Sequence, residues 1–263
     1  MRTYLWSKII DLAYSLKTMK MMYQDYMQNL TEQEFLKKYL YKENQSAITR
    51  DYLIFKENEE KLGFKIVTIY DETYPTKLKF SINPPIAFYY LGDSNLLKNY
   101  MVAVVGSRIA PSKYIKIARN LGIGLSKMNI IGVSGLAKGI DASFHQGIDI
   151  SIGVLGCGID RIYPTVNKAL YKKVMYNGCL ISEYPLNTKP LPWHFPRRNR
   201  LIAGLGDILI LVYAKEKSGS IITLDYALDL GRDIFLTSEM YDRLDLSGYS
   251  IRELKMHLKS FRF

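Results

Sequence analysis

From residue 101 onward, short apolar segments alternate with longer amphipathic segments, a pattern that few folds satisfy. Strands are predicted at residues 101–105, 129–133, 151–155, 179–182, 208–212 and 233–237. Helices are predicted between them, at residues 112–127, 137–146, 166–176, 199–205 and 221–230. Strands that are apolar along their whole length and separated by helices are typical of a parallel sheet covered on both faces. We therefore predict a doubly wound, Rossmann-like α/β fold with a mostly parallel sheet.

The first hundred residues follow a different pattern. Residues 1–62 place apolar and aromatic side chains at helical spacing, and Thr31 with Glu34 forms a capping box, which predicts a small N-terminal helical module. Two strand-like runs follow, at residues 66–70 and 86–91, and Pro84 and Pro85 force an extended path just before the second run. We expect three parts: the helical module (1–62), a lead-in segment packed on the core (63–100) and a Rossmann-like domain (101–263).

Basic charge is concentrated in one part of the sequence. The chain carries 36 Lys and Arg against 25 Asp and Glu, a net charge of +11, and residues 101–217 alone hold 16 basic and 6 acidic side chains. Such a concentrated field attracts polyanions, of which nucleic acid is the commonest. A membrane surface is a poorer match, because the basic residues are interleaved with strand and glycine signals rather than laid along one amphipathic helix.

Length and cysteine content indicate a cytoplasmic protein. The 263 residues, 48% of them hydrophobic, suffice for one core and a smaller module, and no apolar run is long enough for a membrane span or a signal peptide. Cys157 and Cys179 are interpreted as reduced thiols rather than as a disulfide or a metal pair. The three histidines are scattered, so neither a metal site nor a cofactor is predicted.

Three of the four residues at positions 197–200 are arginines, namely Arg197, Arg198 and Arg200, and they come just after Trp193 and His194. We expect them to open a short helix near residue 197, where guanidinium groups and free backbone N–H groups suit a phosphate. A solvated basic loop is the alternative. Neighbouring side chains on a helix point about 100° apart, so at least one arginine must turn away from a ligand and can instead pair with Glu183 or Asp141.

Most of the predicted strands are followed by glycine, often with a hydroxyl or a cation beside it. Ligands bind at this carboxyl end of a parallel sheet, and glycine lets backbone N–H groups approach a phosphate closely. The three-glycine dinucleotide fingerprint is absent after the first strand, which argues against NAD. Asp141 and His145 could form an acid–base pair, but no nucleophile accompanies them, so a structural role is favoured.

Six segments, in order and at comparable spacing, resemble the DNA-processing protein A family, also called Smf. They are VAVVGSR (102–108), VSGLAKGID (133–141), GVLGCGIDRIYP (153–164), ISEYP (181–185), FPRRNRLIAG (195–204) and SGSIITLDYALDLGRDIF (218–235). The resemblance covers roughly residues 66–237. It departs from the family pattern after the last strand, where residues 236–239 replace a Pro-Gly turn, and in the short connection between residues 145 and 151.

The resemblance implies a non-enzymatic, usually homodimeric protein that binds and protects incoming single-stranded DNA in natural transformation and competence. It also implies a role in recombination, in which the protein helps to load the RecA recombinase. Together with the strand-end residues, it predicts a DNA- and phosphate-binding site formed by Gly106, Ser107, Arg108, Ser134, Gly135, Lys138, Gly139, Phe195, Arg197, Arg198, Asn199, Arg200, Ser218, Gly219 and Ser220.

Two points stay open on the sequence. Phe195 and Trp193 could stack on a base, or Phe195 could pack into the core. A nucleotide-processing enzyme of the phosphoribohydrolase-like Rossmann type is the alternative function. The segment 218–223 has the glycine and hydroxyls of such enzymes but not the acidic residue close after them, for which Asp225 is the nearest candidate.

Overall fold

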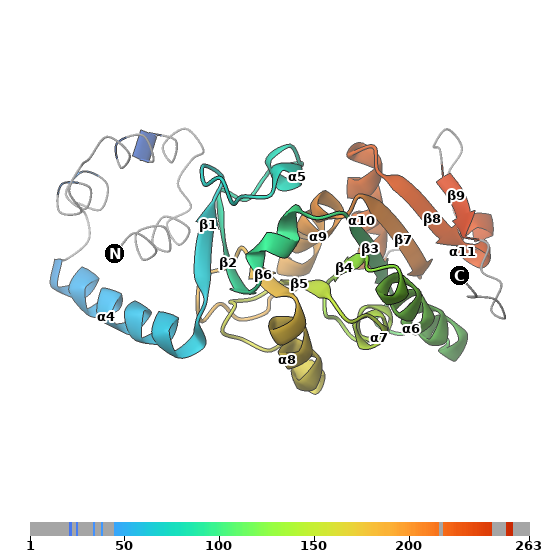
Figure 1. Cartoon of the computed structure of the whole chain (residues 1–263), viewed down its shortest axis with the longest axis horizontal. Coiled ribbons are helices and arrows are strands. Elements are labelled where there is room, and N and C mark those ends of the chain that lie inside the picture. Colours follow the sequence, from blue (N-terminus) through green and yellow to red (C-terminus); the bar gives the residue numbers. More distant parts are fainter. Residues whose placement is uncertain are drawn as a thin grey trace.

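The computed structural model describes residues 45–215, 218–243 and 251–254, together with residues 21, 22, 25, 34 and 38. Its centre is one nine-stranded sheet in the order β1-β2-β6-β5-β4-β3-β7-β8-β9 (Figure 1). The strands are β1 (Lys65–Thr68), β2 (Ala87–Gly92), β3 (Met101–Gly106), β4 (Ile131–Ser134), β5 (Ser151–Leu155), β6 (Cys179–Ser182), β7 (Ile208–Tyr213), β8 (Asp233–Thr237) and β9 (Ile251–Leu254). β2 runs antiparallel to both β1 and β6, and the remaining pairs are parallel. The predicted doubly wound, mostly parallel fold is confirmed.

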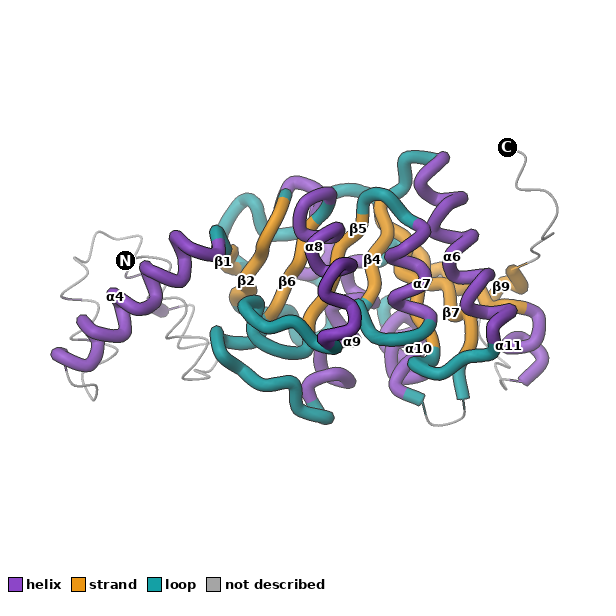
Figure 2. Tube along the Cα trace, turned by 90° about the horizontal axis from the view of Figure 1, so that it is seen from below, coloured by secondary structure: helices purple, strands orange, loops and turns teal. Residues whose placement is uncertain are grey.

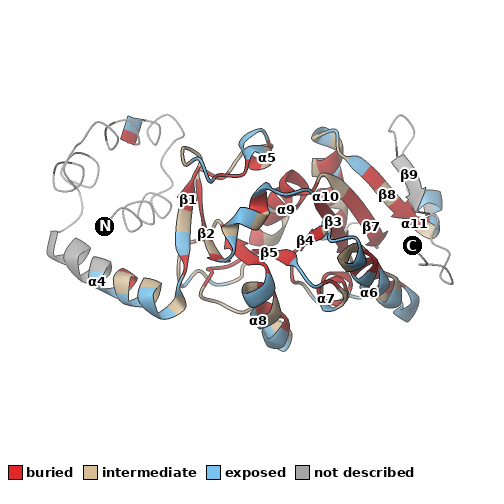
Figure 3. Ribbon diagram, in the orientation of Figure 1, coloured by how far each residue is buried: buried red, intermediate tan, exposed pale blue. Residues whose placement is uncertain are grey.

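Helices cover both faces of this sheet, and its central strands are buried (Figure 3). One face carries α6 (Ser112–Lys127), α7 (Ile140–Gly147) and α8 (Lys168–Asn177), whose apolar residues pack on β3, β5 and β6. The other face carries α9 (His194–Leu205) and α10 (Gly219–Asp229). Alternate residues of β3 point into the two cores, Val102 and Val104 into one and Ala103 and Val105 into the other. None of the described helices is long and apolar enough to cross a membrane.

The segment before residue 100 is built into the core. Besides β1 and β2 it contains α5 (Thr76–Lys79) and the 3₁₀ helix η1 (Ser94–Lys98), and α4 (Gln45–Leu62) leads into β1. The Lys77 ammonium forms an ion pair with Asp207, and the same carboxylate accepts the backbone N–H of Met101 at 2.8 Å. These contacts join α5 to the connection between α9 and β7. Thr31 lies outside the described residues, so its capping box stays a prediction.

Two sequence predictions of secondary structure are wrong. The helix predicted at residues 199–205, which the arginines were expected to open near residue 197, begins earlier, at His194, so the arginines lie within the first turns of α9. Pro196 argued against a helix at this point in the sequence. Proline is nevertheless tolerated in the first turn of a helix, because the N–H groups there have no partner within the helix. α11 (Ser238–Arg243) and β9 were not predicted at all, and they extend the sheet beyond β8.

Lys173 of α8 closes the carboxyl end of α7. Its ammonium donates to the carbonyls of His145 at 3.0 Å, Gln146 at 3.3 Å and Ile148 at 2.5 Å. A cation at this position satisfies carbonyls that the helix leaves unpaired and suits the helix dipole.

Lys173→Met should therefore lower the free energy of unfolding by about 1–2 kcal/mol. Urea denaturation would measure this loss, and Lys172→Met, at an exposed neighbouring position, should stay within about 0.5 kcal/mol of the parent. Equal losses for the two variants would contradict the capping role.

Candidate functional site

A pocket of about 490 Å³ opens at the carboxyl ends of the central strands, where a doubly wound sheet binds ligands. Four segments contribute to its lining: the end of β3 and the loop after it (105–109), the start of α7 (137 and 141), α9 with the residue before it (192, 195, 196, 198, 199 and 202), and the approach to α10 with its first turns (215, 218–220 and 223). Figure 2 shows the loops that follow the strands gathered along one edge of the sheet, next to α9. The pocket therefore depends on chain segments far apart in the sequence.

Close backbone packing fixes the wall that follows β3. Gly106 ends β3, and a Cβ there would lie 2.6 Å from the Ile140 side chain. Gly139 has φ of +74°, and a Cβ on it would lie 2.5 Å from the Ser107 carbonyl oxygen and 2.6 Å from that of Arg108. Only glycine meets both requirements at residue 139, namely the left-handed backbone and the absent side chain. The loop carrying Ser107 and Arg108 therefore rests directly on the start of α7.

Arg198 forms the floor of the pocket and is already hydrogen-bonded. Its side chain is 3% exposed, Nη1 donates to the carbonyls of Gly135, at 2.9 Å, and of Val154, and Nε donates to Asn199 Oδ1 at 3.1 Å. A Cβ on Gly135 would meet the guanidinium at 2.6 Å, so this glycine makes room for the arginine. Burial lowers the pKa of Arg198, an effect that Asp141 opposes. Arg198 therefore contributes positive charge beneath the pocket, but its guanidinium N–H groups already have acceptors within the protein.

Arg200 and Arg197 point away from the pocket. Arg200 is 5% exposed, and its Nη2 donates to Glu183 Oε1 at 2.5 Å while its Nε donates to the Asn83 carbonyl at 2.9 Å. Arg197 is 64% exposed in its side chain and approaches the other oxygen of Glu183 at 3.7 Å. The prediction that at least one arginine turns away and pairs with Glu183 is thus confirmed.

The amino terminus of α10 forms a further wall of the pocket. Ser218 and Ser220 share a hydrogen bond of 2.6 Å, and Asn199 Nδ2 donates to the Gly219 carbonyl at 2.8 Å, which ties this terminus to α9. Lys215 is exposed and lines the pocket, and its backbone N–H donates to Ser107 Oγ at 3.2 Å. A helix amino terminus flanked by hydroxyls and a lysine favours an anion.

Asp141 and His145 do not form an acid–base pair. Asp141 is buried, and its carboxylate accepts the backbone N–H of Ala137 at 3.4 Å. Burial raises the pKa of Asp141, while the Arg198 charge opposes that rise. His145 is fully buried outside the pocket lining and contacts Ser151 Oγ at 2.9 Å. Burial, with the nearby Lys173 charge, lowers the pKa of His145 to about 3, so the imidazole is neutral at physiological pH.

The structure brings together part of the predicted site. The predicted residues that line the pocket are Gly106, Ser107, Arg108, Phe195, Arg198, Asn199, Ser218, Gly219 and Ser220. Those outside the lining are Ser134, Gly135, Lys138, Gly139, Arg197 and Arg200. Ser134 and Gly135 lie beneath the floor, where Ser134 Oγ donates to the Val104 carbonyl at 2.6 Å. Sequence reasoning missed Ile109, Pro192, Pro196, Ile202 and Lys215, of which Lys215 carries a usable signal, a lysine just after an apolar strand. Within the residues that the structure describes, no three His, Cys, Asp or Glu side chains are grouped so as to hold a metal ion.

Sequence comparisons match most of the chain. The sequence model described as DNA recombination-mediator protein A matches residues 65–251. The DNA processing protein DprA of Streptococcus pneumoniae is 40% identical over 182 residues, which are 68% of this chain and 64% of that protein. The DNA processing protein DprA of Bacillus subtilis is 39% identical over 179 residues, 66% of this chain and 60% of that protein. The matched region thus spans less than two thirds of either relative.

Two solved structures share the fold. The X-ray structure of DNA processing protein A from Streptococcus pneumoniae superposes with a TM-score of 0.69 at 28% identity, covering 94% of this chain and 82% of that one. The DNA processing protein A of Helicobacter pylori, whose structure is described as giving insight into its single-stranded DNA binding mode, superposes with a TM-score of 0.62 at 29% identity. That match covers 66% of this chain and 80% of the Helicobacter chain.

Proposed function

Because this chain belongs to the DNA recombination-mediator protein A family, we propose that it is a DNA-processing protein that binds single-stranded DNA in the pocket at the carboxyl ends of β3 and β7. The observation that carries the proposal is the pairing of two exposed cations, Arg108 and Lys215, with the amino terminus of α10 across one pocket. Phosphates suit the cations and the helix terminus. Phe195, which lines the same pocket, offers a ring to a base, which only an unpaired strand can present.

The resemblance in sequence extends this proposal. It supports a homodimeric, non-enzymatic protein of the cytoplasm that protects incoming DNA during natural transformation and helps to load the RecA recombinase onto it. DNA held at the carboxyl edge of the sheet leaves the opposite edge and both helical faces for protein contacts. A surface outside the pocket would allow DNA and a recombinase to be held at the same time.

The alternative of a nucleotide-processing enzyme has no comparable support. Asp225, the acidic candidate for such chemistry, is exposed on α10 and does not line the pocket. Among the described residues that do line it, Asp141 is the only acidic one, and it is buried beside Arg198. We therefore place DNA binding ahead of nucleotide hydrolysis.

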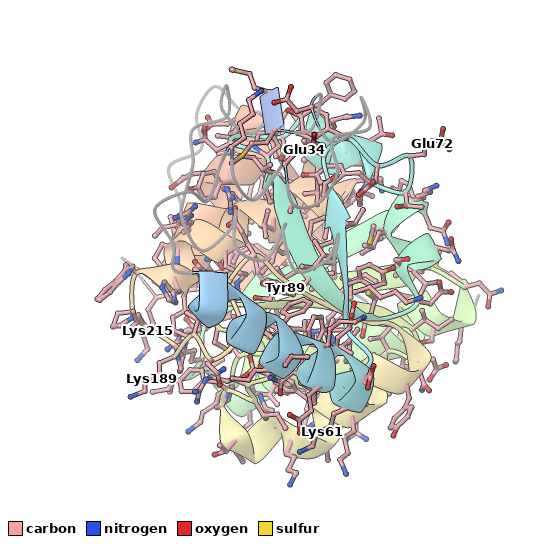
Figure 4. All side chains as sticks on the ribbon, turned by 90° about the vertical axis from the view of Figure 1, so that its left-hand side faces the viewer. Glu34, Lys61, Glu72, Tyr89, Lys189 and Lys215 are labelled. Carbon is pink, nitrogen blue, oxygen red and sulfur yellow. The ribbon has the colours of Figure 1, made fainter. Side chains whose placement is uncertain are left out.

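The proposal is tested by DNA binding as a function of salt. Fluorescence anisotropy should show tighter binding of a labelled single strand than of a blunt duplex of the same length. Arg108→Ala and Lys215→Ala should each lower the slope of log K against log salt by about 0.7, because each removes one phosphate contact. Lys61→Ala is the control, since Lys61 lies on α4 and projects from a different side of the molecule than Lys215 and Lys189 (Figure 4). Equal affinity for duplex and single strand, or an unchanged slope in both pocket variants, would count against the proposal.

A further inference from the structure

We infer that the solvent face of α6 is a docking surface for an acidic protein segment that carries apolar side chains. Four residues form this face, Lys116, Arg119, Ile123 and Lys127, spaced three, four and four positions apart. On a helix of 3.6 residues per turn they lie on one side, within an arc of about 80°, and extend along about 16 Å of α6. None of the four lines the pocket, so the inference goes beyond the proposed function.

The three cations of this face are exposed and have no partner within the described part of the protein. No hydrogen bond or ion pair there holds the side chain of Lys116, Arg119 or Lys127. α6 itself contains no acidic residue. In α7 and the connection after it, the acidic residues are Asp141, which is buried, and Asp149, which is exposed. The face therefore carries an excess of positive charge that the neighbouring residues do not neutralise.

Exposed apolar side chains lie among and beside these cations. Ile123, in the middle of the face, is 40% exposed, and Met128, directly after α6, is 49% exposed. Ile150, which is 41% exposed, belongs to the connection after α7. The adjacent Asp149 N–H donates to Ser126 Oγ at 2.7 Å, so this connection lies against the last turn of α6. The carboxyl end of α6 thus combines apolar surface with positive charge.

This combination favours a protein partner over nucleic acid or a membrane. Phosphates are bound by cations and hydrogen-bond donors, to which exposed isoleucine and methionine add nothing. A membrane-surface helix buries its apolar side in lipid, but the apolar side of α6, with Tyr114, Ala118 and Leu121, is already buried against the sheet. Protein interfaces surround an apolar centre with charged groups, and complementary charge selects an acidic partner.

The face is preformed, because α6 is fixed on α7 by direct backbone contact (Figure 1). A Cβ on Gly122 would lie 2.6 Å from the Phe144 carbonyl oxygen and 2.8 Å from the Ile148 nitrogen. A Cβ on Gly147 would meet the Arg119 carbonyl oxygen. On binding, only the partner segment and the exposed side chains must be ordered, which limits the entropic cost.

The test uses a fluorescein-labelled peptide made of four repeats of Asp-Asp-Leu. Its anisotropy should rise on addition of the protein, and added salt should weaken binding, because exposed charges are screened. The same peptide with alanine in place of leucine should bind several-fold more weakly. Lys127→Glu and Ile123→Ser should each weaken binding of the leucine peptide by about 3- to 10-fold. Melting temperatures check folding, and Lys116→Glu takes the place of either variant that unfolds.

Lys61→Glu and Ile54→Ser, both on α4, are the matched controls. Lys61 lies in the last turn of its helix, as Lys127 does, and Ile54 is 50% exposed. Both controls should bind the peptide as the parent does. All four variants should bind single-stranded DNA as the parent does, and their sedimentation coefficients should be unchanged.

The docking surface would be overturned if the parent did not bind the leucine peptide, or if the alanine peptide bound equally well. Loss of DNA affinity in the α6 variants would assign the face to nucleic acid instead, and a changed sedimentation coefficient would assign it to self-association. Peptide binding by a parent protein that fails to bind single strands would overturn the proposed function and leave the docking surface standing.

Discussion

Replacing Arg200 by alanine should lower the free energy of unfolding by about 3–5 kcal/mol, whereas the same change at Arg197 should lower it by less than about 1 kcal/mol. Arg200 is almost fully buried, and its guanidinium joins Glu183 after β6, the Asn83 carbonyl and the Arg197 carbonyl. Its loss strands the Glu183 carboxylate, which is 13% exposed. Arg197 carries the same charge three residues away, but 64% of its side chain is in water. Urea denaturation of both variants would measure the difference.

A second substitution separates two contributions to this loss of stability: the missing attraction between Arg200 and Glu183, and the cost of burying the Glu183 carboxylate without its partner. In the Arg200→Ala background, Glu183→Gln should recover part of the lost stability, because an amide costs less to bury unpaired than a carboxylate does. Similar losses for Arg197→Ala and Arg200→Ala would show that the ion pair with Glu183 does not hold this part of the molecule together.

Gly139→Ala should cost about 2–4 kcal/mol of stability and should abolish tight binding of single-stranded DNA. The left-handed backbone at this residue is strained for alanine, and the added methyl would lie against two backbone carbonyls, which cannot move aside as a flexible side chain can. The loop that must shift carries Ser107 and Arg108, so the pocket wall shifts with it. Thermal melting and anisotropy with a labelled single strand would record the two losses.

Gly219→Ala is the matched control for stability. Gly219 lines the same pocket at the start of α10, but a Cβ there meets nothing within 4 Å and its φ is not in the left-handed region. Alanine is a better helix former than glycine, so this variant should be as stable as the parent or more stable by up to about 1 kcal/mol. If Gly139→Ala were equally well tolerated, close packing of the wall on α7 would not be what shapes the pocket.

The order of strands and helices after residue 101 could be predicted because each apolar strand is bounded by a glycine or a polar turn. The local pattern does not indicate which strands pair with one another when they are far apart in the sequence. The runs at residues 66–70 and 86–91 were predicted as strands of a lead-in segment, and β1 and β2 indeed form there, but they continue the main sheet beyond β6. That placement depends on pairing between segments far apart in the sequence, such as Tyr89 opposite Ser182, and no periodicity encodes it.

The candidate site, too, could be predicted from the sequence only in part. Glycines and hydroxyls after β3 and before α10 could be assigned to the pocket because the carboxyl ends of parallel strands coincide in space. The roles of Arg198 and Arg200 could not be assigned, since a run of arginines gives no indication of which member has a buried acceptor. Helical geometry predicted only that the three would differ. The acceptors themselves, the carbonyls of Gly135 and Asn83, belong to segments more than sixty residues away.

The antiparallel strand β2 has a consequence for how the protein folds. β1 and β2 are close in sequence and can pair early, with Lys65 opposite Tyr90, whereas the other edge of β2 must wait for β6. All of β3, α6, β4, α7, β5 and α8 lie between the two in the chain. Closing so long a loop is entropically costly, and contacts between distant segments slow folding. During synthesis, the β1–β2 pair therefore leaves the ribosome well before β6, and the edge of β2 that pairs with β6 stays open until then.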